Sequence, residues 1–158
     1  MLDEGKKAPK TTLPTDAGTS LDLAGLKGHP VIVYFYPKDD TSGCTAQAKA
    51  FSEKAKEFSA LDVTVIGISP DSVASHKKFK KKHDLNITLA ADEDKAVATG
   101  WGVWVEKSMY GRKYMGVERT TFLIDENGTI VRIWRKVRVP GHVDEVLAEA
   151  KALSKTGK

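Results

Sequence analysis

The sequence contains almost no cysteine: Cys44 is the only one in 158 residues. A single cysteine excludes a disulfide within the chain, so nothing in its cysteine usage indicates an oxidising compartment. No apolar run approaches the ~20 residues that a membrane-spanning helix needs. Residues 1–10 carry charges of both signs and lack the apolar region of a secretory signal. We therefore expect a cytoplasmic protein that does not associate with membranes.

The composition, with 41% hydrophobic and 29% charged residues, is typical of a globular protein. A chain of this length can bury one well-packed core but is short for two, so we expect a single domain over residues 1–158. Residues 154–158 are mostly polar or small and are expected to form a frayed tail.

The net charge of +4 raises the question of nucleic acid. One basic cluster is "HKKFKKKHD" at residues 76–84, and Arg132, Arg135, Lys136 and Arg138 form a second. Basic and aromatic residues do not alternate as they do in a stacking platform. A solvated helix face and an exposed strand are therefore the preferred interpretation. A nucleic-acid-binding module is kept as an alternative, and it would bind in a salt-dependent manner without needing Cys44.

Hydrophobic periodicity predicts alternating strands and helices. The run "VIVYFY" between Pro30 and Pro37 is typical of a strand buried on both faces. Spacings of three and four residues predict helices, and Asn127-Gly128 predicts a hairpin. The expected strands are 31–36, 61–69, 87–92, 120–125 and 129–134, and the expected helices are 44–58, 71–85, 94–101 and 143–153.

A β-α-β unit followed by β-β-α predicts an α/β protein of the thioredoxin-like fold, a mixed central sheet with helices on both faces. In this fold Cys44 would lie in the first turn of a helix that follows a central strand. Unpaired backbone N–H groups and the positive end of the helix dipole meet there and stabilise an anion. Because the thiolate is the reactive form of cysteine, the position favours a nucleophile. The alternative is that Cys44 is a small buried apolar residue.

The residues before the cysteine favour the first interpretation. Residues 37–44 fit Pro-x-x-x-Thr-x-x-Cys, and in this the chain resembles the peroxiredoxins. Longer stretches resemble the Q-type branch, also called the bacterioferritin comigratory proteins. These stretches are "TLPTDAG", "FYPKDDTSGCT", "GISPDSVASHKKF" and "WGVWVEKSMYGRKYMGVERTTFLID". They occur in the expected order over nearly the whole chain.

The resemblance implies a thiol-dependent peroxidase without a cofactor or metal. Cys44 would attack a hydroperoxide and become a sulfenic acid, while Thr41 would offer its hydroxyl to the peroxide. Arg119 would stabilise the thiolate and polarise the O–O bond, and Pro37 would shield the site from water. The backbone N–H groups of Cys44 and Gly43 would contribute further donors. Hydrogen peroxide is the first expected substrate and organic hydroperoxides are a further one.

Two positions depart from the branch. Ser42 stands where a proline is common, a mild change at the start of a helix. The second departure concerns the resolving cysteine, which many relatives carry five residues on or in the next helix. Here Lys49 occupies the first place, and the helix around 76–83 has no cysteine. The chain is thus either a natural one-Cys form or a variant that lost its second cysteine. The resemblance implies an external reductant (thioredoxin, glutaredoxin or a small thiol) and a monomer.

Other functions are less well supported. A thiol–disulfide oxidoreductase would have Cys-x-x-Cys, but Thr41 stands at the first position, and a copper-delivering relative would also need a second cysteine. A redox-sensing binding module or holdase would use the same reactive thiol with little turnover.

His76 and His83 are too far apart in sequence for a local metal pair, and no third ligand is evident. Loop solvation or helix capping is expected for Asp39 and Asp40.

Overall fold

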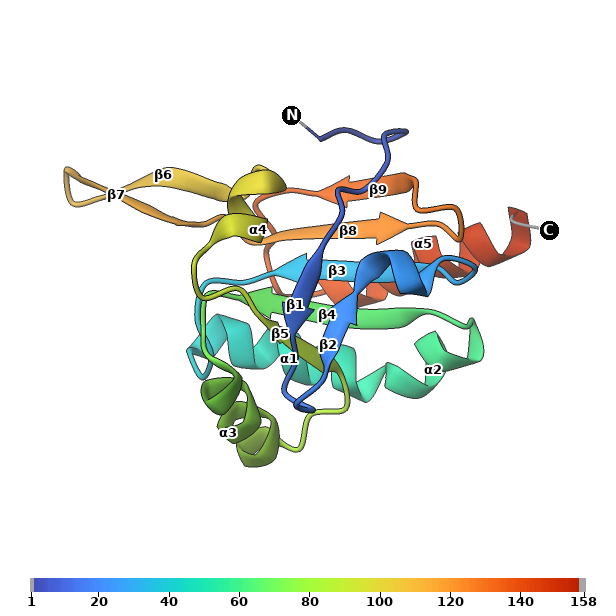
Figure 1. The fold of residues 1–158 in the computed structure, drawn as a ribbon, viewed down its shortest axis with the longest axis horizontal. Helices are drawn as coiled ribbons and strands as arrows, with labels where there is room; N and C mark the ends of the chain where they lie inside the picture. The colour runs from blue at the N-terminus through green and yellow to red at the C-terminus, as the bar shows by residue number, and fades with distance from the viewer. Residues whose placement is uncertain (1, 157–158) are drawn as a thin grey trace.

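The computed structural model describes residues 2–156, and its central feature is a five-stranded sheet in the order β5-β4-β3-β8-β9 (Figure 1). Strand β3 pairs in parallel with β4 and antiparallel with β8, so the sheet is mixed, as expected. The strands are β1 Thr12–Pro14, β2 Ser20–Asp22, β3 Val31–Phe35, β4 Thr64–Ser69, β5 Thr88–Ala91, β6 Trp104–Met109, β7 Arg112–Val117, β8 Thr120–Ile124 and β9 Ile130–Trp134. The helices are η1 Leu23–Leu26, α1 Ser42–Glu53, α2 Ala55–Ala60, α3 Val73–His83, α4 Ala96–Gly100 and α5 His142–Thr156.

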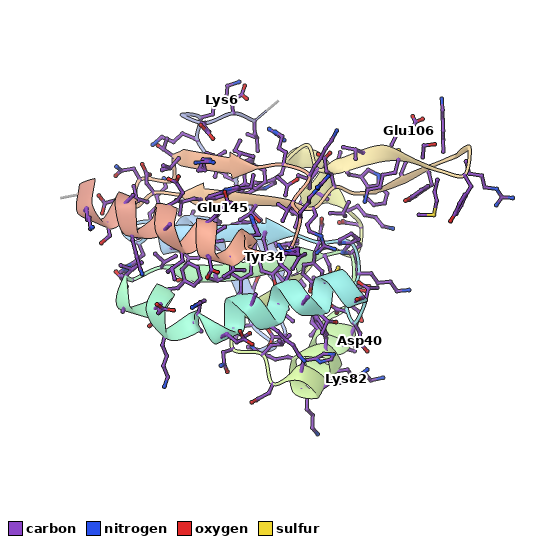
Figure 2. The ribbon with its side chains drawn as sticks, turned by 180° about the vertical axis from the view of Figure 1, so that it is seen from behind. Lys6, Tyr34, Asp40, Lys82, Glu106 and Glu145 are labelled. Carbon is purple, nitrogen blue, oxygen red and sulfur yellow. The ribbon has the colours of Figure 1, made fainter. Side chains whose placement is uncertain are left out.

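The two faces of the sheet are covered differently. Helices α1, α2 and α5 pack on the face that carries Ile32 and Tyr34, and they lie in front of the sheet in Figure 2. The opposite face, which carries Val33 and Phe35, is covered by α4, η1 and the β1–β2 hairpin. Alternate β3 residues thus enter two separate hydrophobic clusters, which explains why the whole strand is apolar.

Several elements differ from the sequence-based expectation. The three-residue strands β1 and β2 and the short helix η1 were not predicted, because such short elements show no periodicity. The helix expected over 44–58 is divided at Lys54, which caps α1 and precedes α2. A hairpin turn lies at Tyr110 and Gly111, with positive φ at both residues. It joins β6 to β7, and this pair projects away from the sheet (Figure 1).

The C-terminal helix is longer than expected. Fraying was expected from Ser154, but α5 continues through Thr156. The rest of that segment, residues 157–158, lies outside the described residues. Within residues 2–156, each helix is too short or too polar to cross a bilayer.

Candidate active site

The strand β3 and the helix α1 place Cys44 at the carboxyl edge of the sheet. Cys44 is the third residue of α1 and is 1% exposed, packed in the same cluster as Ala48 and Phe51. The first hydrogen bond of the helix runs from Thr45 N to Thr41 O. The amides of Gly43 and Cys44 precede this bond, so they belong to the helix end where N–H groups have no carbonyl partner within the helix. This is the position expected for a nucleophilic thiol.

Arg119 reaches the same point from the neighbouring strand. It directly precedes β8, whose Thr120 is paired with Phe35 at the end of β3. The guanidinium Nη2 donates to Cys44 Sγ at 3.3 Å, so the predicted pair is brought together across 75 residues of sequence. A guanidinium keeps its charge at any pH that the protein tolerates. The contact thus puts a permanent cation on the sulfur.

Gln47 was not identified from the sequence, although it lies in the site. Its side chain is fully buried one turn beyond Cys44, and its Oε1 accepts a hydrogen bond of 2.7 Å from Arg119 Nη1. The signal was available, because residues three apart on a helix share a face. The amide and the sulfur together fix both terminal nitrogens of the guanidinium.

Gly43 makes room for this guanidinium. A Cβ added to Gly43 would lie 3.2 Å from Arg119 Nη2. That distance is close for a non-bonded contact, and the arginine is already held by Gln47. The glycine therefore has a steric role, in addition to the expected contribution of its backbone N–H.

Thr41 and Pro37 lie in the loop between β3 and α1. Thr41 has the extended backbone of an N-cap residue, but its side chain makes no cap hydrogen bond. Its exposed hydroxyl instead donates to the carbonyl of Lys38 at 2.9 Å, which leaves the oxygen able to accept a further bond. Pro37 is half-buried two residues after the end of β3. Capping is thus not the role of the Thr41 side chain.

Charges of the site contribute to the pKa shifts of two buried rings, Tyr34 on β3 and His142 at the start of α5. Tyr34 stacks on Phe51 with a centroid distance of 4.6 Å, on the helix-covered face in Figure 2. Burial raises the pKa of Tyr34 well above its usual value, and the charges of Cys44 and Asp39 act in the same direction. His142 faces Thr121 Oγ1 at 2.9 Å, and burial followed by the charge of Arg119 lowers its pKa to about 4. Near neutral pH both rings are therefore uncharged.

The histidines of α3 contact carboxylates. His76 lies against Asp39 and His83 against Asp40, whose side chain in Figure 2 is next to Lys82. Across residues 2–156, the structure has no cluster of three or more His, Cys, Asp or Glu side chains that could hold a metal ion.

Neither position where relatives carry a resolving cysteine has one here. The first is Lys49, whose side chain is exposed, and the second is helix α3, which contains no cysteine.

The chain is similar to known proteins over most of its length. Residues 5–133 match the sequence pattern of the AhpC/TSA family. A Bcp peroxiredoxin of Coxiella burnetii is 53% identical over 92% of this chain and 97% of its own. Peroxiredoxin Bcp of Bacillus subtilis is 44% identical over 97% of this chain and 98% of its own. A bacterioferritin comigratory protein of Xanthomonas campestris, solved with trapped intermediates and ligands to explain its alkyl peroxide reduction, superposes with a TM-score of 0.87. It is 40% identical, over 91% of this chain and 92% of that one.

These relatives show that the chain is a thiol-dependent peroxidase, and its sheet has the thioredoxin-like arrangement of the solved structure. The chain belongs to the AhpC/TSA family. Within that family it is a peroxiredoxin of the Bcp or Q-type branch, with one cysteine. The branch expected from the sequence motifs is thereby confirmed.

Proposed function

We propose that Cys44 is the peroxidatic cysteine and that Arg119, Thr41, Gly43 and Pro37 form its peroxide site. The observation that carries the proposal is the 3.3 Å contact from Arg119 Nη2 to Cys44 Sγ at the start of α1. A cation fixed on the sulfur favours the thiolate, which is the nucleophile. The same guanidinium can donate to a peroxide oxygen as charge develops there.

The reaction is a two-electron oxidation of sulfur. The Cys44 thiolate attacks one oxygen of the hydroperoxide, an S–O bond forms, and the O–O bond breaks. The second oxygen leaves with the bonding electrons and takes up a proton, giving water from hydrogen peroxide or an alcohol from an organic hydroperoxide. Sulfur is left as a sulfenic acid. Arg119 and the amides of Gly43 and Cys44 face the oxygens on which negative charge develops, and Thr41 offers its hydroxyl to the substrate.

Regeneration needs thiols from outside the chain, because Cys44 is its only cysteine. The first thiol attacks the sulfenic sulfur, which releases water and leaves a mixed disulfide. A second thiol then displaces Cys44 as a thiolate. We propose thioredoxin, glutaredoxin or a low-molecular-weight thiol as the reductant, and both hydrogen peroxide and organic hydroperoxides as substrates. The alkyl peroxide reduction of the Xanthomonas relative supports the second substrate class.

The remaining expectations also stay proposals: a monomer acting in the cytoplasm as one domain, without a nucleic-acid partner.

Stopped-flow measurement of the second-order oxidation of Cys44 by hydrogen peroxide tests the site. Ionisation of a free thiol accounts for about a thirty-fold gain at most. A rate orders of magnitude above that limit supports a peroxidase site. A rate within this thirty-fold limit would reject the proposed peroxidase site. Fast oxidation of Cys44 without sustained consumption of peroxide in the presence of thiols would favour a redox sensor.

A further inference from the structure

Asp39 lies in the loop that leads to Cys44 and is buried, with an exposed fraction of 7%. The expectation of a solvated or capping side chain is therefore wrong for Asp39. Its Oδ1 accepts a hydrogen bond of 2.6 Å from the Tyr36 hydroxyl. Its Oδ2 accepts one of 2.8 Å from Ser75 Oγ and lies 2.7 Å from His76 Nδ1. The carboxylate thus connects the residue that follows β3, the loop and α3.

His76 is fully buried, and both of its ring nitrogens face acceptors. Nε2 lies 2.9 Å from the Ala90 carbonyl of β5, which can only accept, so this nitrogen carries a hydrogen. Nδ1 faces the Asp39 carboxylate, which already accepts from Tyr36 and Ser75. Burial, with the Asp39 charge, raises the pKa of Tyr36, which therefore stays a donor. These partners together favour an imidazolium paired with a carboxylate.

The backbone of Asp39 is held as well. Its N–H donates to Asp71 Oδ2 at 2.8 Å, and the same oxygen accepts from Ser69 Oγ at 2.6 Å. Ser69 is the last residue of β4, and Asp71 lies in the turn before α3. The loop is therefore anchored two residues before Thr41 and five before Cys44. Among residues 2–156, the titratable groups with a recorded contact to the ring of His76 are Asp39 and Tyr36, which directly follows β3. His83 lies further along α3 and contacts the Phe79 ring instead.

The contact between His76 and Asp39 also has an electrostatic consequence. Both Cys44 and Asp39 act on the buried Tyr34, where each raises the pKa of the phenol. Asp39, which precedes Cys44 by five residues in the loop, and the Cys44 thiol are thus both within electrostatic range of one buried ring. An unpaired anion there would oppose the thiolate, since like charges disfavour each other's ionised forms. The imidazolium that the acceptors around His76 favour would cancel the charge of Asp39.

We propose that His76 is a positioning residue of the peroxidase: its cation fixes Asp39, and with it the loop to Thr41 and Cys44, and neutralises a carboxylate that would oppose the thiolate. The proposal rests on the proposed role of Cys44 as the peroxidatic cysteine. It assigns a function to a buried ion pair that makes no contact with the reacting sulfur.

The experiment compares His76→Gln with His83→Gln across pH. The first variant removes the cation but keeps an amide N–H for the Ala90 carbonyl. The second makes the same change on the same helix, at a histidine whose partner Asp40 has a side chain 43% exposed and is screened by water. The rate of Cys44 oxidation by hydrogen peroxide is followed by stopped flow, and folding is checked by thermal denaturation.

For His76→Gln, the midpoint of the pH–rate profile should rise by roughly one pH unit, since an unpaired carboxylate then faces the thiolate. Below that midpoint the rate should fall about ten-fold, because it follows the thiolate fraction. His83→Gln should leave the midpoint unchanged. The double variant Asp39→Asn/His76→Gln removes the extra anion and should restore the midpoint, while its lower plateau rate reports the lost positioning of the loop.

A folded His76→Gln variant with the wild-type midpoint and plateau would overturn the proposal, even if its melting temperature fell. A wild-type protein that reacts no faster than a free thiol would instead reject the proposed function, so the two failures are distinguishable. Nitrogen NMR of the wild-type ring tests the pair without any variant. Protonation of both His76 nitrogens near neutral pH supports it, and an unprotonated Nδ1 would refute it.

Discussion

Gly67 lies directly against the phenol ring of Tyr34, and a Cβ added to Gly67 would come within 2.7 Å of the Tyr34 hydroxyl oxygen. Both residues are buried and paired across β3 and β4. Gly67→Ala should therefore force the ring to shift and destabilise the protein by about 1–3 kcal/mol. Urea denaturation at equilibrium measures this free energy.

Gly100→Ala is the matched control, since a Cβ at Gly100 meets no atom within 4 Å. It should change the stability by less than about 0.5 kcal/mol, as surface substitutions usually do. Equal losses in the two variants would contradict the steric account of Gly67.

Arg119→Lys should slow the oxidation of Cys44 by about 10²–10³-fold, the range seen when one donor to a developing oxyanion is removed. A lysine keeps the charge but has a single ammonium group, so it cannot contact both Sγ and Gln47 Oε1 as the guanidinium does. Stopped-flow kinetics measures the change. Arg132→Lys is the control, because Arg132 pairs with Glu149 outside the site. A rate for Arg119→Lys close to that of the wild type would show that charge alone suffices.

Gly43→Ala should slow the reaction by several-fold with little effect on stability, because alanine suits a helix and the new Cβ meets only the guanidinium at 3.2 Å. The contact would push Nη2 away from the sulfur. Ser42→Ala, a change at the exposed neighbouring position, serves as the control in the same assay. Similar rates for both variants and the wild type would mean that Arg119 adjusts without cost.

Local patterns explain which parts of the structure could be predicted from the sequence. The strand expected at 31–36, the helix turn with Cys44 and the hairpin at Asn127-Gly128 depend on neighbouring residues. The structure has the strand at 31–35, Cys44 in the first turn of a helix that starts at Ser42, and the hairpin. Motifs indicated Arg119, since its place before a strand is a local feature. The Gln47–Arg119 and Asp39–His76 contacts span 72 and 37 residues, so their partners are defined only by the folded sheet. The burial of Asp39 was missed because an Asp-Asp pair after a strand is typical of a solvated turn.

Stability should fall as the solution is acidified, because His142 is buried in its neutral form. Its pKa is lowered from 6.5 to about 4, chiefly by burial and then by Arg119. Between these values the unfolded chain binds a proton that the folded chain does not, so unfolding becomes easier as the pH decreases. The loss begins near the unfolded pKa and is complete below about 4, and it amounts to roughly 2 kcal/mol after allowance for solvent screening.

Urea denaturation at several pH values checks this dependence. In His142→Gln the decrease over this window should be smaller, although the variant loses some stability at every pH. His29→Gln is the control, since the His29 side chain is 52% exposed and pairs with the exposed Asp62. An identical pH dependence in His142→Gln and the wild type would exclude His142 as its source.

Excess peroxide without any thiol should convert Cys44 to the sulfinic acid. The sulfenic acid has no second cysteine in the chain with which to form a disulfide, so a second peroxide molecule can oxidise it further. Mass spectrometry of the intact protein should show the addition of a second oxygen and the loss of peroxidase activity. Adding a small thiol with the peroxide should prevent both, because the thiol captures the sulfenic acid first. A protein that remains at the sulfenic acid under prolonged excess peroxide would contradict the prediction and would indicate that burial of Cys44 protects the oxidised sulfur.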